Sequence, residues 1–347
     1  MSHSLCPPTV KEYPLASSER NIKVCTINLF NYVEPPNAFY DFANIYTKEE
    51  WTIKTRWLSQ TITKIDADII GFQEVFSIDS LRKTMHLLGY THFVTVDTPE
   101  VEQDYIYSNP VVALASRHPV SQTLSINASS AIARSQSNFK FNRTPIHAVV
   151  DIPQLGPIDV YVVHLKSQRP TELDTQPDEE RHDEPSTSER WLLESQGKWL
   201  STVQRGMEVH VLHHHMIETK KQNERPCLLM GDFNQSLQSN EFHCLTSRHL
   251  FRLKESETAL SAFHLHNSQD LVLEQTEITS TPTYYVGAQG KELDYILLSN
   301  EFSDCSDQAR GIVTDYQVID SHLVNPRYGH DHISTDHGIV TVNISII

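Results

Sequence analysis

The chain lacks any apolar run long enough to cross a membrane, and it has few cysteines for its 347 residues. Its N-terminus, MSHSLCPPTVKEYPL, lacks the basic start and apolar stretch of a secretory signal. We therefore expect no membrane span and a cytoplasmic location. The cysteines are odd in number and scattered, without CxxC or Cys/His spacing. Such a set predicts free thiols and no structural disulfide at Cys6, Cys25, Cys227, Cys244 and Cys305.

Positive charge is also scarce. Lysine and arginine number 28 against 44 aspartates and glutamates, which gives a formal net charge of −16. A protein that binds nucleic acid regardless of sequence usually carries a basic stripe, because neutralising phosphates supplies most of its affinity. That stripe is missing, so a phosphodiester substrate would have to be held by metal and a few local cations. Hydrophobic residues make up 39% of the chain, as in ordinary globular proteins, and nothing indicates a protein partner.

Strands and helices alternate along the chain without an internal repeat or a long linker, which favours sheets covered by helices. The first 20 residues are polar and contain proline, so we expect a loosely held arm over residues 1–20 and a single domain over residues 21–347. Strands are predicted at Ile22–Ile27, Asp68–Phe72, Val111–Ser116, Thr144–Asp151, Ile158–His164, Cys227–Gly231, Leu293–Ser299 and Gly338–Ile344.

Two capping boxes predict where helices begin. Thr47-x-x-Glu50 opens a helix to about Asp66, and Ser186-x-x-Glu189 opens a longer helix to about Lys221. Residues 168–190 are rich in Asp, Glu, Pro and Thr and contain almost no apolar side chains, which predicts an exposed acidic loop inserted in the domain.

Polar side chains follow the ends of predicted strands in six segments. Residues at strand ends project into the crevice above a sheet, where sites assemble on a rigid base. One such segment alone carries little information, because Gly-Asp-x-Asn also occurs in turns, where Asp and Asn bond their own backbone. The segments are Ile27-Asn28, Gly71-Phe-Gln-Glu74, His164-Leu-Lys-Ser167, Gly231-Asp-Phe-Asn234, Leu293-Asp-Tyr-Ile296 and Ser334-Thr-Asp-His337.

Together, and in this order, the six segments resemble those of the endonuclease/exonuclease/phosphatase superfamily. The resemblance runs from about Ile22 to Ile344 and is closest to bacterial members that carry His-Leu-Lys-Ser and Gln-Glu-Val-Phe. It implies an α/β protein with the deoxyribonuclease-I-like fold, a four-layer α/β/β/α sandwich of two mostly antiparallel sheets flanked by helices. It also implies metal-dependent hydrolysis of phosphoesters.

The candidate metal ligands are oxygen donors, which suit one or two ions of Mg²⁺ or Mn²⁺. Glu74 directly follows an apolar run and is the first choice for the principal ligand. The resemblance adds the amide of Asn28 and the carboxylate of Asp336. Asp232 and Asn234 are two apart on an extended segment, so both side chains face the same way. They could grip a second ion, the attacking water or a phosphate oxygen.

The candidate catalytic residues also come from the resemblance. His337 would be the base that activates water, or would contact the scissile phosphate, and Asp294 would hold its imidazole. Asp232 and Asn234 belong to the same catalytic group. His164 would assist the leaving oxygen, and Arg143 and Lys166 would bind the substrate phosphate.

Several residues remain open on the sequence alone. Asn109 is a candidate to support the imidazole of His164. Tyr40, Tyr46 and Trp51 could stack on bases, although core packing is the favoured interpretation. Three consecutive histidines, 213 to 215, point about 100° apart on a helix, so the run is not expected to hold a metal ion.

A nuclease is the favoured function, with nucleic acid as the expected phosphodiester substrate. The alternative is a phosphatase or a sphingomyelinase-like phosphodiesterase acting on a smaller or lipid phosphoester, to which the acidic net charge and Gln-Glu-Val-Phe give weight. An inactive binding module ranks last, because every core position of the six segments is present. The choice between DNA and RNA, and between endo and exo action, is not encoded in these segments.

Overall fold

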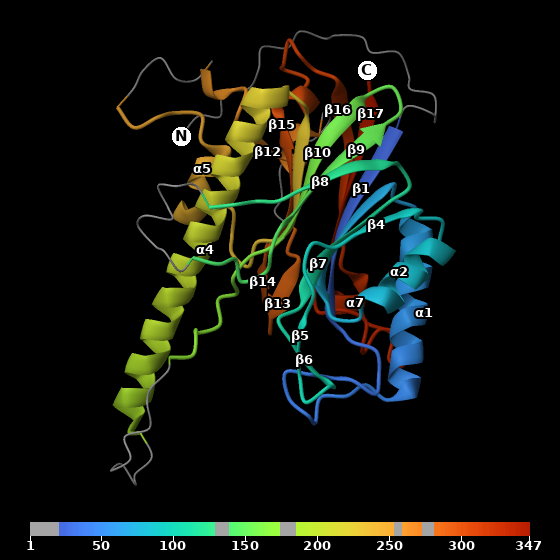
Figure 1. Ribbon diagram of the computed structural model, residues 1–347, viewed down its shortest axis with the longest axis vertical. Coiled ribbons are helices and arrows are strands. Elements are labelled where there is room, and N and C mark those ends of the chain that lie inside the picture. Colours follow the sequence, from blue (N-terminus) through green and yellow to red (C-terminus); the bar gives the residue numbers. More distant parts are fainter. Residues whose placement is uncertain (1–20, 129–138, 174–184, 253–258, 273–280) are drawn as a thin grey trace.

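This computed structural model describes residues 21–128, 139–173, 185–252, 259–272 and 281–347. Two six-stranded sheets are stacked face to face, with helices on both outer sides (Figure 1). The predicted four-layer α/β/β/α sandwich is therefore confirmed. The predicted N-terminal arm at 1–20 and residues 174–184 of the predicted acidic loop lie outside the described residues.

The first sheet has the strand order β16-β17-β1-β3-β7-β4. Its pairs are antiparallel except for β1 with β3. The pairing of β3 with β7 contains a β-bulge between Phe72 and Val75. The strands are β1 (Asn21–Tyr32), β3 (Ile69–Val75), β4 (His92–Val94), β7 (Val111–Ser116), β16 (Gly311–Ile319) and β17 (Ile339–Ile346).

The second sheet has the order β12-β15-β11-β10-β9-β8, and only β10 and β11 pair in parallel. Its strands are β8 (Val120–Leu124), β9 (Ile146–Ile152), β10 (Gly156–His164), β11 (Cys227–Asp232), β12 (Leu265–Asn267) and β15 (Asp294–Ser299). Two small sheets flank one end of the sandwich. They consist of β13 (Tyr284–Val286) with β14 (Gln289–Lys291), and of β2 (Ala38–Phe39), β6 (Ile106–Ser108) and β5 (Glu100–Glu102).

The eight predicted strands are all present, with ends that differ by a few residues. Strand β16 was not predicted. Its register shifts between Val313 and Asp315, and such a bulge breaks the simple apolar alternation on which the prediction relied. The short strands of the two small sheets also carry too few residues for a periodic signal.

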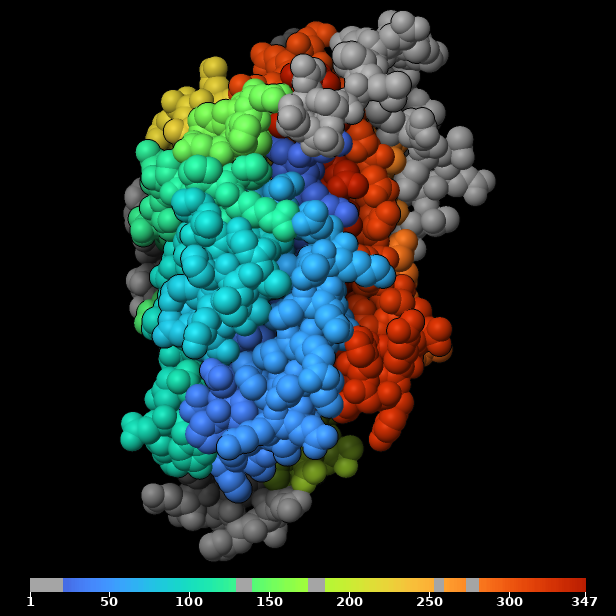
Figure 2. All heavy atoms as spheres, turned by 90° about the vertical axis from the view of Figure 1, so that its right-hand side faces the viewer, coloured from blue at the N-terminus to red at the C-terminus, as the bar shows by residue number. Residues whose placement is uncertain are grey.

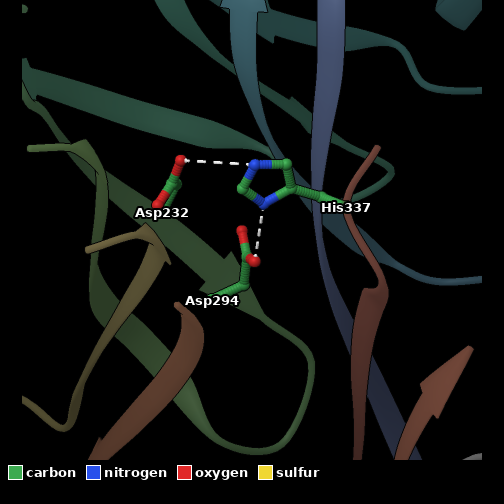
Figure 3. A group of neighbouring side chains, drawn as sticks. All are labelled: Asp232, Asp294 and His337. Carbon is green, nitrogen blue, oxygen red and sulfur yellow. Dashed lines mark hydrogen bonds and ion pairs between the residues drawn. The ribbon is translucent and has the colours of Figure 1, made fainter. Parts of the chain in front are cut away.

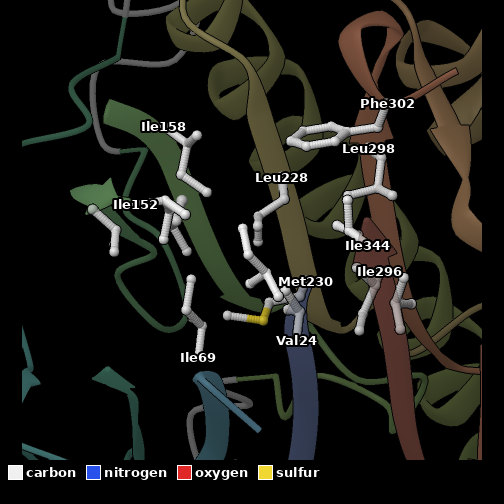
Figure 4. Packing of buried hydrophobic residues seen from close by; sticks show 14 of the residues in the cluster. Val24, Ile69, Ile152, Ile158, Leu228, Met230, Ile296, Leu298, Phe302 and Ile344 are labelled. Carbon is white, nitrogen blue, oxygen red and sulfur yellow. The ribbon is translucent and has the colours of Figure 1, made fainter. Parts of the chain in front are cut away.

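The main core lies between the sheets (Figure 4). In β10, Ile158, Val160 and Val162 point into this core, whereas Tyr161 and Val163 point outward to α4. Both faces of the strand are thus buried, which explains its nearly continuous apolar sequence. Two further clusters fill the spaces between each sheet and its helices.

Helices α1 (Lys48–Ile65) and α2 (Ile78–Leu87) cover the first sheet, and the short α7 (Ser321–Val324) lies beside α1. Figure 2 shows this face, with the red C-terminal segment against the blue α1. The capping box is confirmed: Glu50 N–H donates to Thr47 Oγ1 at 3.1 Å, and Thr47 N–H donates to Glu50 Oε2 at 2.7 Å. The helix begins where this local signal predicts it.

Helices α4 (Thr187–Asn223) and α5 (His243–Thr246) cover the second sheet. Short 3-10 helices occur at η2 (Asn240–Phe242), η3 (Ser268–Leu271) and η4 (Asn300–Phe302). The second capping box, Ser186 with Glu189, is confirmed, so α4 begins inside the predicted 168–190 loop. None of the described helices combines the length and apolar character that a membrane span requires.

The prediction of five free thiols and no disulfide is wrong. Cys25, Cys227 and Cys244 are free, but Cys305 is disulfide-bonded. Spacing along the chain does not show which thiols approach each other in space, and a disulfide depends on that approach. The unpaired cysteines therefore no longer support the expected cytoplasmic location.

Candidate active site

Strand register brings the predicted site residues to one end of both sheets. His164, Asp232 and Asp294 are direct cross-strand neighbours in β10, β11 and β15. Strand β1 runs antiparallel to β17, so the end of β1 adjoins the start of β17. From the first sheet this end carries Asn28, Glu74, Asp336 and His337.

Except for Asn28 and Asp294, these residues line a cleft of about 200 Å³. Glycine is required at one point beside it. Gly231 has φ of +143°, and a Cβ there would lie 2.0 Å from the carbonyl oxygen of Val163. Strands β10 and β11 can approach this closely only without a side chain at 231. The cleft is lined by Tyr40, Glu74, Arg143, His164, Ser167, Gln168, Arg169, Asp232, Asn234, Tyr284, Lys291, Leu293, Asp336 and His337.

The imidazole of His337 is held by Asp294 (Figure 3). His337 Nδ1 lies 2.8 Å from Asp294 Oδ2, and Thr283 Oγ1 donates to the same oxygen at 2.6 Å. Burial by itself would lower the pKa of His337, but the carboxylates of Asp294 and Asp232 outweigh it and raise the pKa well above its ordinary value. The carboxylates around the ring therefore favour the protonated form of His337.

Asp232 lies between two imidazoles. Its Oδ2 is 4.0 Å from His337 Nε2 and 3.4 Å from His164 Nε2. Asn28 Nδ2 donates to Oδ2 at 3.1 Å, and the Asn234 N–H donates to Oδ1 at 2.7 Å. Burial, with the nearby charge of Asp294, raises the pKa of Asp232 to about 7. The carboxylate can therefore exchange a proton near neutral pH.

The imidazole of His164 is buried. Burial, together with the positive charges of Arg143 and His337, lowers its pKa well below the ordinary value. Its Nδ1 has no hydrogen-bond partner among the described residues. The candidate support, Asn109, is exposed and makes no hydrogen bond to this Nδ1, so that prediction is wrong.

Glu74 and Asp336 form an acidic pair at the cleft. Glu74 has φ of +61° within a β-bulge, and its Oε2 accepts the Asn31 N–H at 2.8 Å. Burial raises the pKa of Asp336, and the charge of Glu74 adds to this effect while His337 opposes it. Both residues line the cleft, and carboxylate oxygens are the ligands that a hard divalent cation prefers. The amide of Asn28 lies behind them, where its Oδ1 accepts the Phe30 N–H at 3.0 Å.

A second set of atoms also has the spacing of a metal site. Asp232, Asp294 and His337 each offer a ligand atom within 4.8 Å of the others. However, Asp294 Oδ2 already accepts from Thr283 and contacts His337. We therefore favour the oxygen donors of Glu74 and Asp336 for the ion, and we treat His337 with Asp294 as a catalytic pair.

Lys54 is a buried cation that the sequence analysis missed. Only 2% of it is exposed, and its Nζ donates to the carbonyl oxygens of Phe30 at 3.0 Å, Ile333 at 3.2 Å and Ser334 at 2.8 Å. Burial lowers its pKa to about 7, although nearby carboxylates oppose the shift. Lys54 thereby joins the segment after Asn28 to the segment before Asp336. The position of Lys54 on the apolar face of a predicted helix could have indicated its burial from the sequence.

The cations of the cleft differ in part from those predicted. Arg143 lines it, with Nη1 3.4 Å from the carbonyl oxygen of Leu165. Lys166 does not: its N–H donates to Glu208 Oε2 at 2.8 Å, and its Nζ lies 3.5 Å from the carbonyl oxygen of Arg169. Arg169 and Lys291 line the cleft and were not predicted.

The three aromatic residues weighed for stacking separate into two kinds. The rings of Tyr46 and Trp51 pack on each other at 6.3 Å, as core packing predicts. Tyr40, by contrast, is 47% exposed and lines the cleft beside Arg143. The histidine run contributes no ligand to the metal-like group found among the described residues, and His215 instead contacts His147 at 2.9 Å.

A model of the endonuclease/exonuclease/phosphatase family matches residues 38–337. The chain belongs to this family, whose members are phosphoester-hydrolysing enzymes. The catalytic domain of human Nocturnin with bound sulfate is similar in structure, with a TM-score of 0.59, 16% identity, and coverage of 94% of this chain and 95% of that one. No curated protein matches the chain.

Two further solved structures have the same fold. A family protein from Bacteroides thetaiotaomicron has a TM-score of 0.57 at 15% identity, with 93% of this chain and 97% of that one covered. Truncated TDP2 from Caenorhabditis elegans has a TM-score of 0.53 at 13% identity, with 94% and 98% covered. At these identities the similarity establishes the fold, which is the one predicted.

Proposed function

We propose that the protein is a divalent-metal-dependent phosphodiesterase in which Asp232 activates the attacking water. The position of Asp232 is the observation that supports this most directly. Its Oδ2 faces the cleft between the imidazoles of His164 and His337, at 3.4 Å and 4.0 Å from their Nε2 atoms. A carboxylate with a pKa near 7 can accept a proton from water at neutral pH.

Glu74 and Asp336 would hold Mg²⁺ or Mn²⁺, and Asp232 with Asn234 offers donors for a second ion. When bound, the metal supplies positive charge to a phosphate oxygen and acidifies water. The protein's part is to hold the carboxylates in place. The Asn31 N–H fixes Glu74 at 2.8 Å for this purpose.

His337 would contact the phosphate as a cation. Of the two roles that the family resemblance allows, its raised pKa supports this one, since an imidazolium cannot accept a proton from water. Asp294 and Thr283 hold the ring so that Nε2 faces the cleft. A fixed positive charge at this point stabilises the negative charge that develops on the phosphoryl oxygens.

His164 and two arginines would act on the leaving side and on the substrate phosphate. His164 lines the cleft, and its Nε2–H would donate a hydrogen bond to the departing oxygen. Arg143 and Arg169 line the same cleft, and a planar guanidinium can bind two phosphate oxygens at once.

Nucleic acid is the substrate class that we favour. Tyr40 presents an exposed ring beside Arg143 and Arg169, and such a group can stack on a base while the arginines bind adjacent phosphates. The net charge of −16 favours short or single-stranded substrates over long duplexes. A lipid phosphodiester is the second candidate, because α4 exposes two tryptophans, Trp191 and Trp199, to solvent.

A panel of substrates with added and removed metal tests this proposal. Plasmid DNA, single-stranded DNA, RNA, sphingomyelin vesicles and a bis-aryl phosphodiester are incubated with Mg²⁺, with Mn²⁺ and with EDTA. We expect hydrolysis that requires metal and that Asp232→Asn abolishes. Asp79→Asn, an exposed acidic residue on α2, is the matched control. Full activity in EDTA, or wild-type turnover by Asp232→Asn on every substrate, contradicts the proposal.

A further inference from the structure

The first turns of α4 expose apolar side chains to solvent. Residues 187–196 include no buried residue, and the first buried position of the helix is Gly197. In Figure 1 this yellow-green end of α4 extends away from the sheets. The exposed apolar residues, called here the α4 face, are Trp191 (74% exposed), Leu192 (67%), Leu193 (37%), Trp199 (66%) and Leu200 (37%).

The α4 face points away from the protein. The opposite side of the helix contacts the body, where the Thr171 N–H donates to the Gly197 carbonyl oxygen at 3.1 Å and Ser201 Oγ donates to the Arg169 carbonyl oxygen at 2.6 Å. At about 100° per residue, the five apolar side chains span an arc of roughly 200° whose centre lies roughly opposite Gly197 and Ser201. The apolar side of this amphipathic segment thus faces solvent instead of the protein.

The local charge is balanced. Residues 187–200 contain Glu189, Arg190, Glu194 and Lys198, two acidic and two basic side chains. The whole chain is strongly acidic, so an anionic membrane surface is not attracted to it. A neutral surface with an apolar interior is complementary to the α4 face. Tryptophan is enriched at the boundary between lipid headgroups and acyl chains, where its ring and N–H are both accommodated.

We propose that the α4 face docks onto a zwitterionic lipid surface. A second copy of the chain is a poorer fit in area. A tryptophan buries about 150–250 Å² when fully covered, so two of them supply well under the roughly 800 Å² per partner of a specific interface. An interfacial helix needs only its own apolar side covered by lipid.

Docking would hold the cleft on the far side of α4 from the lipid. Arg169, which lines the cleft, contacts Ser201 on the side of the helix opposite the α4 face. The binding of α4 to lipid therefore does not depend on the proposed function.

The chain's own tryptophans provide a specific readout. It has four, and the other two, Trp51 and Trp57, lie on α1 in partly or fully buried positions. Phosphatidylcholine vesicles should shift the fluorescence of the full chain to shorter wavelength, and a brominated phosphatidylcholine should quench it. In sedimentation with the vesicles, Trp191→Ala/Trp199→Ala should reduce partitioning by roughly tenfold or more. Leu87→Ala, which removes an 81% exposed side chain on α2, should have no effect.

Three outcomes overturn the proposal. The first is no binding or spectral shift at any phosphatidylcholine concentration. The second is binding that appears only when anionic lipid is added. The third is a lipid-free, concentration-dependent dimer that the double variant abolishes in sedimentation equilibrium. Turnover of a water-soluble bis-aryl phosphodiester separates this inference from the proposed function, because the double variant should leave that turnover unchanged whether or not vesicles bind.

Discussion

The core between the sheets and the cleft at their end are built from the same strands. Met230 of β11 is fully buried in the core, and Asp232, two residues further on, is 1% exposed in the cleft. On β15, Ile296 is fully buried in the core, and Asp294, two residues earlier, is 1% exposed and contacts His337. The two aspartates are as deeply buried as their neighbours in the core, but they carry carboxylates where the core has apolar side chains.

The two regions also differ in how many buried polar atoms lack a hydrogen-bond partner. The core contains apolar side chains that need no partner (Figure 4). The cleft contains orphaned polar atoms, His164 Nδ1 and Asp294 Oδ1, and left-handed backbone at Glu74 and Asn234. Such features lower stability, and they persist only where the surrounding structure holds them. The rigid core thus supports a site that would not be stable by itself.

The largest expected effect is a loss of catalytic activity without a matching loss of stability. Asp232→Asn and His337→Ala should each reduce kcat/KM by roughly 10²- to 10⁴-fold, because they remove the proposed base and the proposed phosphate-contacting cation. Thermal unfolding should change little, since neither side chain belongs to an apolar cluster. Steady-state kinetics and calorimetry on the same preparations measure both. A large loss of stability in both variants would show that the two regions are not separable.

A substitution in the core should have the reverse effect, a loss of stability without a loss of activity. Leu298→Ala should lower the free energy of unfolding by about 2–5 kcal/mol, through lost apolar burial and the cavity left behind. Leu298→Met keeps the volume and should cost less than about 1.5 kcal/mol. Urea denaturation gives the stabilities. At a temperature where Leu298→Ala is folded, its kcat/KM should equal that of the wild type, and a loss comparable to that of Asp232→Asn contradicts the comparison.

Lys54 joins two chain segments beside the cleft and should affect metal affinity. Lys54→Met removes the three hydrogen bonds that join the segments next to Asn28 and Asp336. Partners that orient metal ligands typically contribute 10- to 100-fold in affinity, so activity should need roughly that much more Mg²⁺. Lys64→Met, at an exposed position of α1, is the control. An unchanged Mg²⁺ requirement in a folded Lys54→Met protein would remove this role.

The Asp294 carboxylate should set the alkaline limit of activity. A carboxylate favours the imidazolium and raises the pKa of His337, so Asp294→Asn should lower that pKa. A reaction that needs protonated His337 is then lost at lower pH. The alkaline limb of the kcat/KM profile should therefore move toward neutral pH. The acidic limb, which follows Asp232, should also move to lower pH, because the charge of Asp294 helps to raise the pKa of Asp232 to about 7. Identical profiles would exclude the pair from the rate-limiting chemistry.

The smallest expected effect concerns the cysteines. In denatured, unreduced protein, Cys25, Cys227 and Cys244 should react with a thiol reagent, whereas Cys305 should react only after reduction. Mass spectrometry of the labelled peptides identifies each site. Labelling of Cys305 without a reductant would contradict the disulfide.

The sequence by itself determined the elements that depend on neighbouring residues. Both capping boxes placed their helices, because each uses contacts between residues three apart. Apolar runs placed the main strands, and the order of the polar segments predicted the family and the fold. These features can be recognised within a short window of the chain.

Only the tertiary structure decided what surrounds those segments. The register of β11 with β15 brings Asp232 opposite Asp294, and α1 brings Lys54 to three carbonyl oxygens from two distant segments. Arg169 lines the cleft and Lys166 does not, although both lie just beyond the same strand. Such contacts depend on strand pairing and helix packing across long sequence separations. No local pattern encodes them, because the same short motif can face a cleft or a helix according to what packs beside it.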